Sequence, residues 1–472
     1  MSAQSELAKV SADSVNHDDQ AIIDAGYKPQ LRRSLGRFAS FAIPFSEISI
    51  TTGIFANYGF VLGHAGPFGF WAWLLVAAGQ MLLALVFAEL AGRIPLTGSC
   101  YNWNNKLGNP TAAWFVGWLG IVGYTIGVAA VSTTMVSILA VIVGHPIDTQ
   151  TGCVIASALI VVQMLINLYG VRLTSHINIG AVIAEIVGVG GLALLIVLAV
   201  SSRGHFNVGL LTTVPSDPHP YWQGFMMATL LGMWTMIGFE CSADVSEETV
   251  NARRVTPKGI LSALLVSAVV GFAFIVVMTL AIPDLSEISK ASYPLAAIAD
   301  YYLGHDFTNV FLIFALVAMF ACSLVCMMAG SRIMFAVARD KRFIASSFFS
   351  KVSAHHVPKG PLFLMSAVAV VFTFMADSAT SLYGAGTVCY VIYSLITVIS
   401  FALKAQKMPK TDTFSLERWH WPVVILAALW LIVEIGVLTI PQEFHPVAIA
   451  TGGVLAVGGA VYLIVMRKTG NA

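Results

Sequence analysis

Long runs of apolar residues, separated by short polar segments, follow one another along almost the whole chain. A helix that crosses ~30 Å of hydrocarbon needs about 20 apolar residues, because each residue adds about 1.5 Å along the axis. Twelve runs qualify, and each predicts a membrane-spanning helix. They lie near residues 38–62, 68–92, 111–143, 153–170, 176–200, 223–249, 257–282, 307–338, 361–376, 380–403, 420–440 and 446–466.

The composition agrees with this pattern. Of the 472 residues, 57% are apolar or aromatic and only 10% are charged, whereas soluble domains carry about 25% charged residues. Most of the surface must therefore face lipid, which predicts an all-α polytopic membrane protein. The net charge of +1 gives no indication of a nucleic-acid partner. The first 37 residues are polar and lack an early apolar segment, so they predict a cytoplasmic tail and not a cleaved signal peptide.

The positions of the basic residues predict the orientation, because Lys and Arg near the ends of spans stay on the cytoplasmic side. With twelve spans and the N-terminus inside, only Arg203 and Lys290 of the 25 Lys and Arg residues fall outside. Adding or removing a span in the middle would destroy this asymmetry. We therefore expect both termini to be cytoplasmic, in the cell (inner) membrane. The predicted parts are an N-terminal tail (1–37), a ten-helix core (38–404), helices eleven and twelve (405–466) and a C-terminal tail (467–472).

Two spans carry residues that weaken a helix at mid-depth. The first contains Thr51-Thr52-Gly53, and the sixth contains Ile237-Gly238-Phe239-Glu240. These spans hold the same position in two five-helix halves, about 38–200 and 223–404, which is typical of inverted-repeat transporters with discontinuous helices. The alternative is that the two glycines only allow neighbouring helices to pack closely.

Unwound backbone in the middle of a membrane exposes N–H and C=O groups that a polar substrate can bind. Glu47 lies about one turn before the first predicted break and Glu240 lies at the second, and no Lys or Arg lies at a matching depth. The two carboxyls could bind a cationic amine or a proton, or one could be held neutral. Alternatively, Glu240 could clamp the broken helix, and Glu47 could be an outward-facing or protonated carboxyl.

Other polar and aromatic residues in the spans allow two interpretations each. Glu185, in the middle of the fifth span, could exchange a proton or could simply bond to a neighbouring helix. Tyr124, Trp234 and Phe239 could form an aromatic wall around an ammonium group, although aromatic residues are also ordinary core residues.

Carboxylates towards the predicted cytoplasmic ends have basic residues near them in the sequence. Glu89 and the pair Glu247-Glu248 are expected to form structural or inner-gate ion pairs with partners such as Arg93, Arg253 and Arg254. They are therefore not predicted to bind substrate.

Several other classes of function find no support in the sequence. The six cysteines are scattered and read as small core residues, so we predict no metal site and no cofactor. No glycine-rich phosphate loop indicates a primary pump. The adjacent pair His355-His356 lies in a Lys-rich loop and does not indicate an enzyme. A channel or a non-transporting sensor remains an alternative to a transporter.

Four stretches resemble the amino acid-polyamine-organocation superfamily, within it the amino acid/choline transporter branch. They are Ser49-Ile50-Thr51-Thr52-Gly53-Ile54-Phe55; Ala88-Glu89-Leu90 with Pro95-Leu96-Thr97-Gly98-Ser99-Cys100-Tyr101-Asn102-Trp103; Gly238-Phe239-Glu240 with Ser246-Glu247-Glu248-Thr249; and Arg332 with Ala338-Arg339-Asp340.

The resemblance implies a LeuT-like fold, with a five-plus-five inverted repeat, two further helices, discontinuous helices one and six, and alternating access. It also implies that the backbone at 49–54 and at 237–240 lines the substrate pocket. Thr51 stands where many relatives have glycine, which makes this loop stiffer and adds a hydroxyl.

These observations predict a secondary active transporter for amino acids or related small amines, coupled to protons. The alternative is an exchanger of cationic amines such as polyamines or choline. Its partners are the small substrate and the lipid bilayer. The predicted substrate-binding residues are Glu47, Ser49, Ile50, Thr51, Thr52, Gly53, Ile54, Tyr124, Trp234, Ile237, Gly238, Phe239 and Glu240, and Glu185 and Glu240 are the candidates for proton coupling.

Overall fold

The computed structural model describes residues 19–203, 206–214, 221–375, 379–405, 408 and 413–469. Within these residues the regular structure is helical, apart from one isolated β-bridge between Leu35 and Thr249. Ten helical segments are long and apolar enough to cross a membrane. The helix at Lys359–Met375 is shorter, and the segment between 221 and 248 is interrupted. The fold is therefore all-α and polytopic, as predicted.

The long helices follow the predicted spans to within a few residues. In the first half of the chain they are α2 (Arg37–Ile48), α3 (Ile50–Ala65), α4 (Ala72–Arg93), α5 (Ser99–Lys106), α6 (Pro110–Val143), α7 (Thr149–Leu168) and α8 (Val171–Arg203). In the second half they are α9 (Tyr221–Ala228), α10 (Leu230–Thr235), α11 (Cys241–Asp244), α12 (Ala252–Leu280), α13 (Leu285–Ile288), α14 (Pro294–Leu303), α15 (His305–Arg339), α16 (Ser346–Phe349), α17 (Lys359–Met375), α18 (Ala379–Lys404), α19 (His420–Thr439) and α20 (His445–Thr469).

Helix α6 shows how local sequence sets these limits. It begins at Pro110 after Asn109, whose side chain accepts a hydrogen bond from the Ala112 N–H, and it ends at Gly144, which has a φ of +72°. Its 34 residues are about 50 Å long at 1.5 Å per residue, which exceeds the ~30 Å of hydrocarbon. A helix of this length must tilt or project beyond the bilayer.

The first span is broken at Ser49, and the predicted break at Thr51-Thr52-Gly53 is wrong by two residues. Helix α2 ends at Ile48, Ser49 adopts a left-handed conformation with a φ of 35°, and α3 starts at once with Ile50. The Ser49 hydroxyl accepts a hydrogen bond from the Thr52 N–H at 3.3 Å, so it caps the new helix. The two threonines then occupy the first turn of α3, where their low helix propensity matters little.

Gly53 therefore has the packing role that was the alternative interpretation. A Cβ atom at this position would lie 1.9 Å from the Thr235 hydroxyl oxygen, so α3 and α10 approach too closely for any side chain there.

The sixth span is interrupted where the sequence predicts it and over a longer stretch. Helices α9 and α10 end at Thr235, residues 236–240 are not helical, and α11 has only four residues. Gly238 has a φ of +76°, and a Cβ atom there would lie 2.3 Å from Cγ of Glu47. Glycine is thus required both for the backbone conformation and for the contact between the two broken spans.

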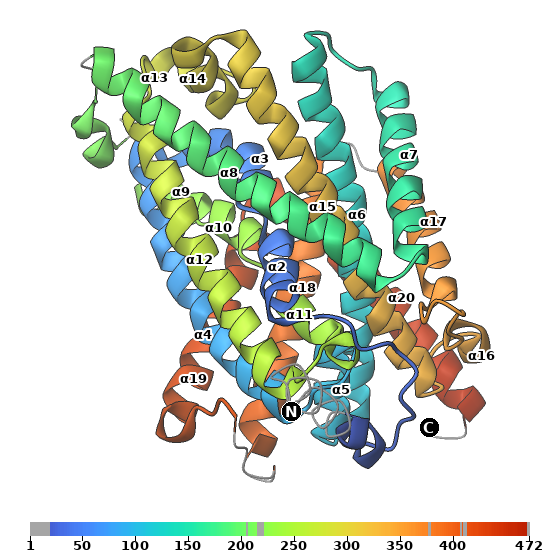
Figure 1. Ribbon diagram of the computed structural model, residues 1–472. Coiled ribbons are helices and arrows are strands. Elements are labelled where there is room, and N and C mark those ends of the chain that lie inside the picture. The colour runs from blue at the N-terminus through green and yellow to red at the C-terminus, as the bar shows by residue number, and fades with distance from the viewer. Residues whose placement is uncertain are drawn as a thin grey trace, which may run out of the picture.

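The broken spans lie in the middle of the helix bundle. Helix α2 packs against α8, α12 and α15, and α3 packs against α9 and α10. Figure 1 shows that the segment before α2 and the end of α20 lie at the same end of the bundle, while α13 and α14 lie at the opposite end. We refer to the first of these ends as the tail end.

Candidate substrate-binding cavity

A cavity of about 80 Å³ lies where the two breaks face each other, among α2, α3, α6, α10, α15 and α18. A single water needs ~10–15 Å³ measured in this way, so the cavity has room for several waters or a small polar molecule. Seven predicted site residues line it: Glu47, Thr52, Gly53, Tyr124, Trp234, Ile237 and Gly238.

The other six predicted site residues do not line the cavity. Ile50, Ile54 and Phe239 are buried among apolar neighbours, and the Phe239 ring lies 6.3 Å from that of Tyr390. Ser49 and Thr51 bond to another carboxylate, and Glu240 lies behind the cavity wall, as described below.

Glu240 is buried and held by two tyrosines that line the cavity. The Tyr124 hydroxyl donates to Oε1 of Glu240 at 3.1 Å, and the Tyr393 hydroxyl donates to the same oxygen. The second oxygen, Oε2, has no hydrogen-bond partner among the described residues. Glu240 is thus connected to the cavity through tyrosine hydroxyls, an arrangement compatible with both a clamp and a proton site.

Glu47 lines the cavity itself. The Cys326 thiol donates to its Oε1 at 2.9 Å, and the Cys322 thiol donates to its backbone carbonyl at 3.4 Å. Its second oxygen, Oε2, has no hydrogen-bond partner in the described part of the chain. The described lining includes no Lys, Arg or His, so the cavity presents a carboxyl group without a protein cation beside it.

Glu185 of α8 stabilises the first break and does not face the cavity. Its Oε1 accepts hydrogen bonds from the Thr51 N–H at 2.9 Å and from the Ser49 hydroxyl at 3.2 Å. These donors are at the start of α3, where the helix dipole also favours a negative group. The bond to a neighbouring helix, the plainer of its two interpretations, is therefore present.

Several lining residues were missing from the predicted set. Tyr390 and Tyr393 of α18 are three residues apart and so share one helix face, a spacing that could have indicated them. Asn57 lines the cavity and donates its amide to the Gly53 carbonyl at 2.9 Å. The Trp234 indole N–H and the Tyr390 hydroxyl are buried and have no partner within the described residues, so they remain available to a ligand.

The carboxylates near the tail end are paired with arginines. Glu247 accepts from Arg339 at 3.0 Å, and Glu248 accepts from Arg332 at 2.9 Å. Both arginines come from α15, and the sequence analysis did not name them as partners. Glu89 pairs with Arg93 one turn later on α4, as predicted.

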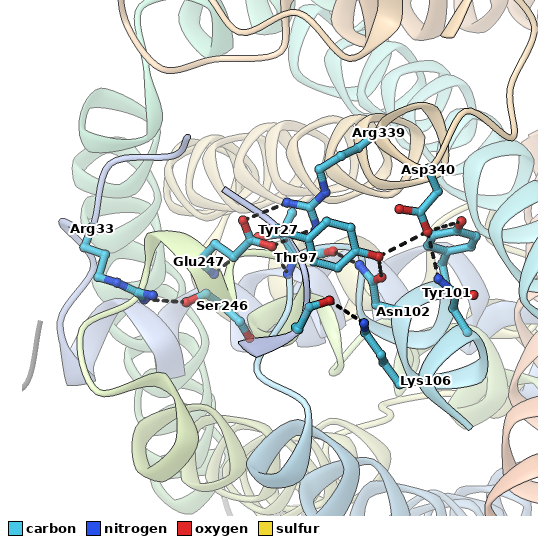
Figure 2. A network of polar contacts seen from close by, with 12 residues as sticks. Tyr27, Arg33, Thr97, Tyr101, Asn102, Lys106, Ser246, Glu247, Arg339 and Asp340 are labelled. Carbon is cyan, nitrogen blue, oxygen red and sulfur yellow. Dashed lines mark hydrogen bonds and ion pairs between the residues drawn. The ribbon is translucent and has the colours of Figure 1, made fainter. Parts of the chain in front are cut away.

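A segment before α2 covers these ion pairs, as Figure 2 shows. The Arg339 guanidinium lies 3.9 Å from the centre of the Tyr27 ring, and the Tyr27 hydroxyl donates to Asp340 at 3.2 Å. Burial and the nearby Asp340 carboxylate raise the pKa of Tyr27, which keeps its hydroxyl protonated. Lys106 donates to the Ala25 carbonyl at 2.6 Å.

Further along the same segment, Arg33 donates to the carbonyls of Ser246 and Thr249, at 3.3 and 2.9 Å. We call residues 19–36 the covering segment. Because it bonds to α5, to α15 and to the end of the sixth span, it closes the tail end of the bundle.

A polytopic helical bundle with a polar cavity between two helix breaks defines the class of membrane transporters with discontinuous helices. Sequence comparison then gives the family: the profile described as "Amino acid permease" matches residues 35–464, and the chain belongs to this family. The resemblance described from the sequence is confirmed.

Curated relatives extend over nearly the full chain. The amino-acid permease BAT1 of Arabidopsis thaliana is 26% identical over 94% of both chains. The BAT1 homolog of Oryza sativa subsp. japonica is also 26% identical, over 93% of this chain and 91% of its own. The thiamine transporter thi9 of Schizosaccharomyces pombe is 22% identical over 99% of this chain and 88% of its own. The chain is therefore a multi-pass membrane transporter for amino acids or amines, and not an enzyme.

Proposed function

We propose that this protein is a secondary active transporter that binds an amino acid or a related amine in the cavity between its two helix breaks and works by alternating access. The observation that carries this proposal is the cavity itself, in which a carboxyl group, unpaired donors and aromatic rings meet broken backbone. An ammonium group fits this environment, since Glu47 supplies charge and Trp234 and Tyr390 supply π faces.

The architecture supports a LeuT-like arrangement of twelve spans. The ten long segments, α17, and the interrupted α9–α11 together give this number. Helix pairs in one half also have counterparts in the other: α8 packs on α15 as α18 packs on α6, and α6 packs on α7 as α15 packs on α17. These pairs are related by adding five to the number of each span, as an inverted repeat requires.

In the proposed arrangement, residues 38–404 form the transport core, with repeats at about 38–200 and 223–404, and 405–466 add two helices. The basic-residue pattern supports a cytoplasmic location for both termini in the cell membrane, so the tail end would face the cytoplasm. The covering segment would then hold the cytoplasmic gate closed.

Proton coupling is the proposed source of energy, and no cofactor is required. Glu47 and Glu240 are both buried at mid-depth, and neither has a Lys or Arg partner among the described contacts. A carboxyl in such a place is stable when it carries a proton or meets a cationic substrate. Exchange between these two states would link the proton to the substrate. Glu185 is the second candidate for the proton.

A thermal-shift screen of the purified protein tests the substrate proposal. A ligand at 100 times its Kd stabilises the folded state by about 2.7 kcal/mol, which a melting curve resolves. Amino acids, γ-aminobutyrate, choline and polyamines form the panel, and the active compounds are then tested for counterflow in liposomes. Transport requires faster uptake when the same substrate is preloaded. A channel would show no such acceleration, and no stabilising compound in the panel would contradict the proposed class of substrate.

The second candidate function is exchange of cationic amines, favoured by the uncompensated Glu47 and by the likeness to a thiamine transporter. Glu47→Gln separates the two candidates. If the carboxylate recognises a cation, choline or polyamine binding weakens more than binding of a zwitterionic amino acid. Equal weakening of both would argue against the cationic substrate.

A further inference from the structure

Two thiols and a carboxyl group meet at one point of the cavity wall. Cys322 and Cys326 lie four residues apart on α15, so both side chains are on the same helix face. Their sulfur atoms and a carboxylate oxygen of Glu47 all lie within 4.8 Å of one another. We propose that Glu47, Cys322 and Cys326 form a binding site for a thiophilic divalent metal ion such as Zn²⁺ or Cd²⁺.

The distances fit such an ion with little movement. Zinc–sulfur bonds of about 2.3 Å at tetrahedral angles place two sulfur atoms about 3.8 Å apart. The three ligand atoms are already within 4.8 Å of one another, so rotation of side chains by about 1 Å closes the site. One thiol already points to the carboxylate, because Cys326 donates to Oε1 of Glu47 at 2.9 Å.

A further observation points to a ligand at this place. Oε2 of Glu47 is buried and has no hydrogen-bond partner among the described residues. Binding a metal through either oxygen would satisfy the carboxylate, and the fourth metal position would face the cavity, open to water or to substrate.

The ligand set selects the kind of ion. Thiolate sulfur favours soft ions such as Zn²⁺ and Cd²⁺ over Na⁺ or Mg²⁺, which prefer oxygen ligands. When the ion binds, each thiol gives up its proton to water in the cavity and a metal–sulfur bond replaces the S–H bond. No electron is transferred, so no oxidant or reductant is needed.

The position of the site gives it a consequence for transport, and this part rests on the proposed function. The ion would join α2, just before its break, to α15, and it would occupy the wall of the proposed substrate cavity. Alternating access requires these elements to move relative to each other. A bound metal would therefore inhibit uptake, and the substrate would compete with it.

The test uses purified full-length protein and Cd²⁺, whose thiolate complexes have a charge-transfer absorption in the ultraviolet. We expect one Cd²⁺ per protein with this absorption. The double variant Cys322→Ser/Cys326→Ser should bind at least about 100-fold more weakly, and Glu47→Gln about 10-fold more weakly. The matched control is Cys153→Ser/Cys389→Ser, which removes two thiols outside the cavity lining and should bind normally. A melting curve checks that each variant is folded, and single Cys326→Ser replaces the double variant if that one is not.

Undiminished absorption in the cavity variants, or its loss in the control, would overturn the metal site. Uptake in liposomes with and without Cd²⁺ separates this inference from the proposed function. Inhibition of the unmodified protein and the control, but not of the cavity variant, supports both. Cd²⁺ binding without inhibition would support the metal site and would instead overturn the location of the substrate in this cavity.

Discussion

The sixth span contains carboxylates of two kinds, only seven residues apart. Glu240, in the break, has tyrosine hydroxyls as partners and no arginine in its described contacts, whereas Glu247 and Glu248 are paired with Arg339 and Arg332. All three side chains are equally buried. Burial therefore does not separate a structural carboxylate from a functional one, but the identity of its partner does.

The difference has a physical reason. An arginine neutralises a buried carboxylate permanently and fixes both side chains in place, which suits the closed tail end. A tyrosine hydroxyl stabilises a carboxylate without cancelling its charge, so Glu240 can still respond to a proton or a cation. Asp244, between the two groups, is fully buried and has no hydrogen-bond partner for either oxygen among the described residues, so it belongs with Glu240.

The largest expected effect is on stability, at the paired end. Arg332→Met leaves the buried Glu248 without its cation, and breaking a buried ion pair in this way costs about 3–5 kcal/mol. Thermal unfolding in detergent measures the change. The double variant Arg332→Met/Glu248→Gln removes both charges and should recover much of the loss. An equally large loss in the double variant would show that side-chain packing, and not charge, determines the effect.

The next effect is on transport, at the unpaired carboxylate. Glu240→Gln removes the charge that the two tyrosine hydroxyls stabilise, and loss of a charged hydrogen bond of ~1.5–3 kcal/mol corresponds to about 10- to 100-fold slower uptake. Uptake into liposomes, normalised to the amount of protein inserted, measures it.

The matched control is Glu434→Gln, the same change at a buried carboxyl that accepts from Gln80 at 2.6 Å, outside the cavity. It should leave uptake within about twofold. Similar losses in both variants would mean that any buried carboxyl has this effect and that Glu240 has no special role.

A smaller effect is expected at the covering segment. Tyr27→Ala removes a cation–π contact with Arg339 that contributes about 0.5–2 kcal/mol, so opening of the tail end should become about 2- to 30-fold more frequent. The rate at which a maleimide added on the tail side labels the cavity cysteines reports this opening. Tyr301→Ala, at the exposed Tyr301–Arg203 contact of 5.7 Å, is the control and should not change that rate. A faster rate in both variants would contradict a local gate.

The smallest effect is expected where an ion pair is partly exposed to water. Asp19 lies 2.8 Å from Arg33, but its side chain is 37% exposed, so solvent screens the interaction. Asp19→Asn should change the free energy of unfolding by less than about 1 kcal/mol and leave labelling unchanged. A shift as large as that of Arg332→Met would remove the distinction between buried and exposed pairs.

Most of the fold could be predicted because apolar length and basic-residue placement act along the chain itself. The second break could also be predicted, because Gly238 and its neighbours weaken a helix wherever they stand. The first could not be placed correctly, because Ser49 caps α3 with help from Glu185, which is 136 residues away.

The site could be predicted in part for the same reason. Residues next to the breaks, such as Glu47 and Trp234, follow from the sequence, whereas Tyr393 and the cysteines of α15 reach the cavity only through tertiary packing. The pairing of Glu247 with Arg339 likewise depends on how α15 lies against the sixth span, which no local pattern contains.

The interrupted sixth span also affects how the chain enters the membrane during synthesis. Its helical pieces have eight, six and four residues, and four carboxylates lie between 240 and 248, so it is not among the segments that qualify as spans by length and hydropathy. The insertion machinery favours continuous apolar helices and disfavours Asp and Glu at their centre. We therefore expect this segment to remain outside the bilayer in a nascent chain that stops before α12, and to enter only when its neighbours are complete.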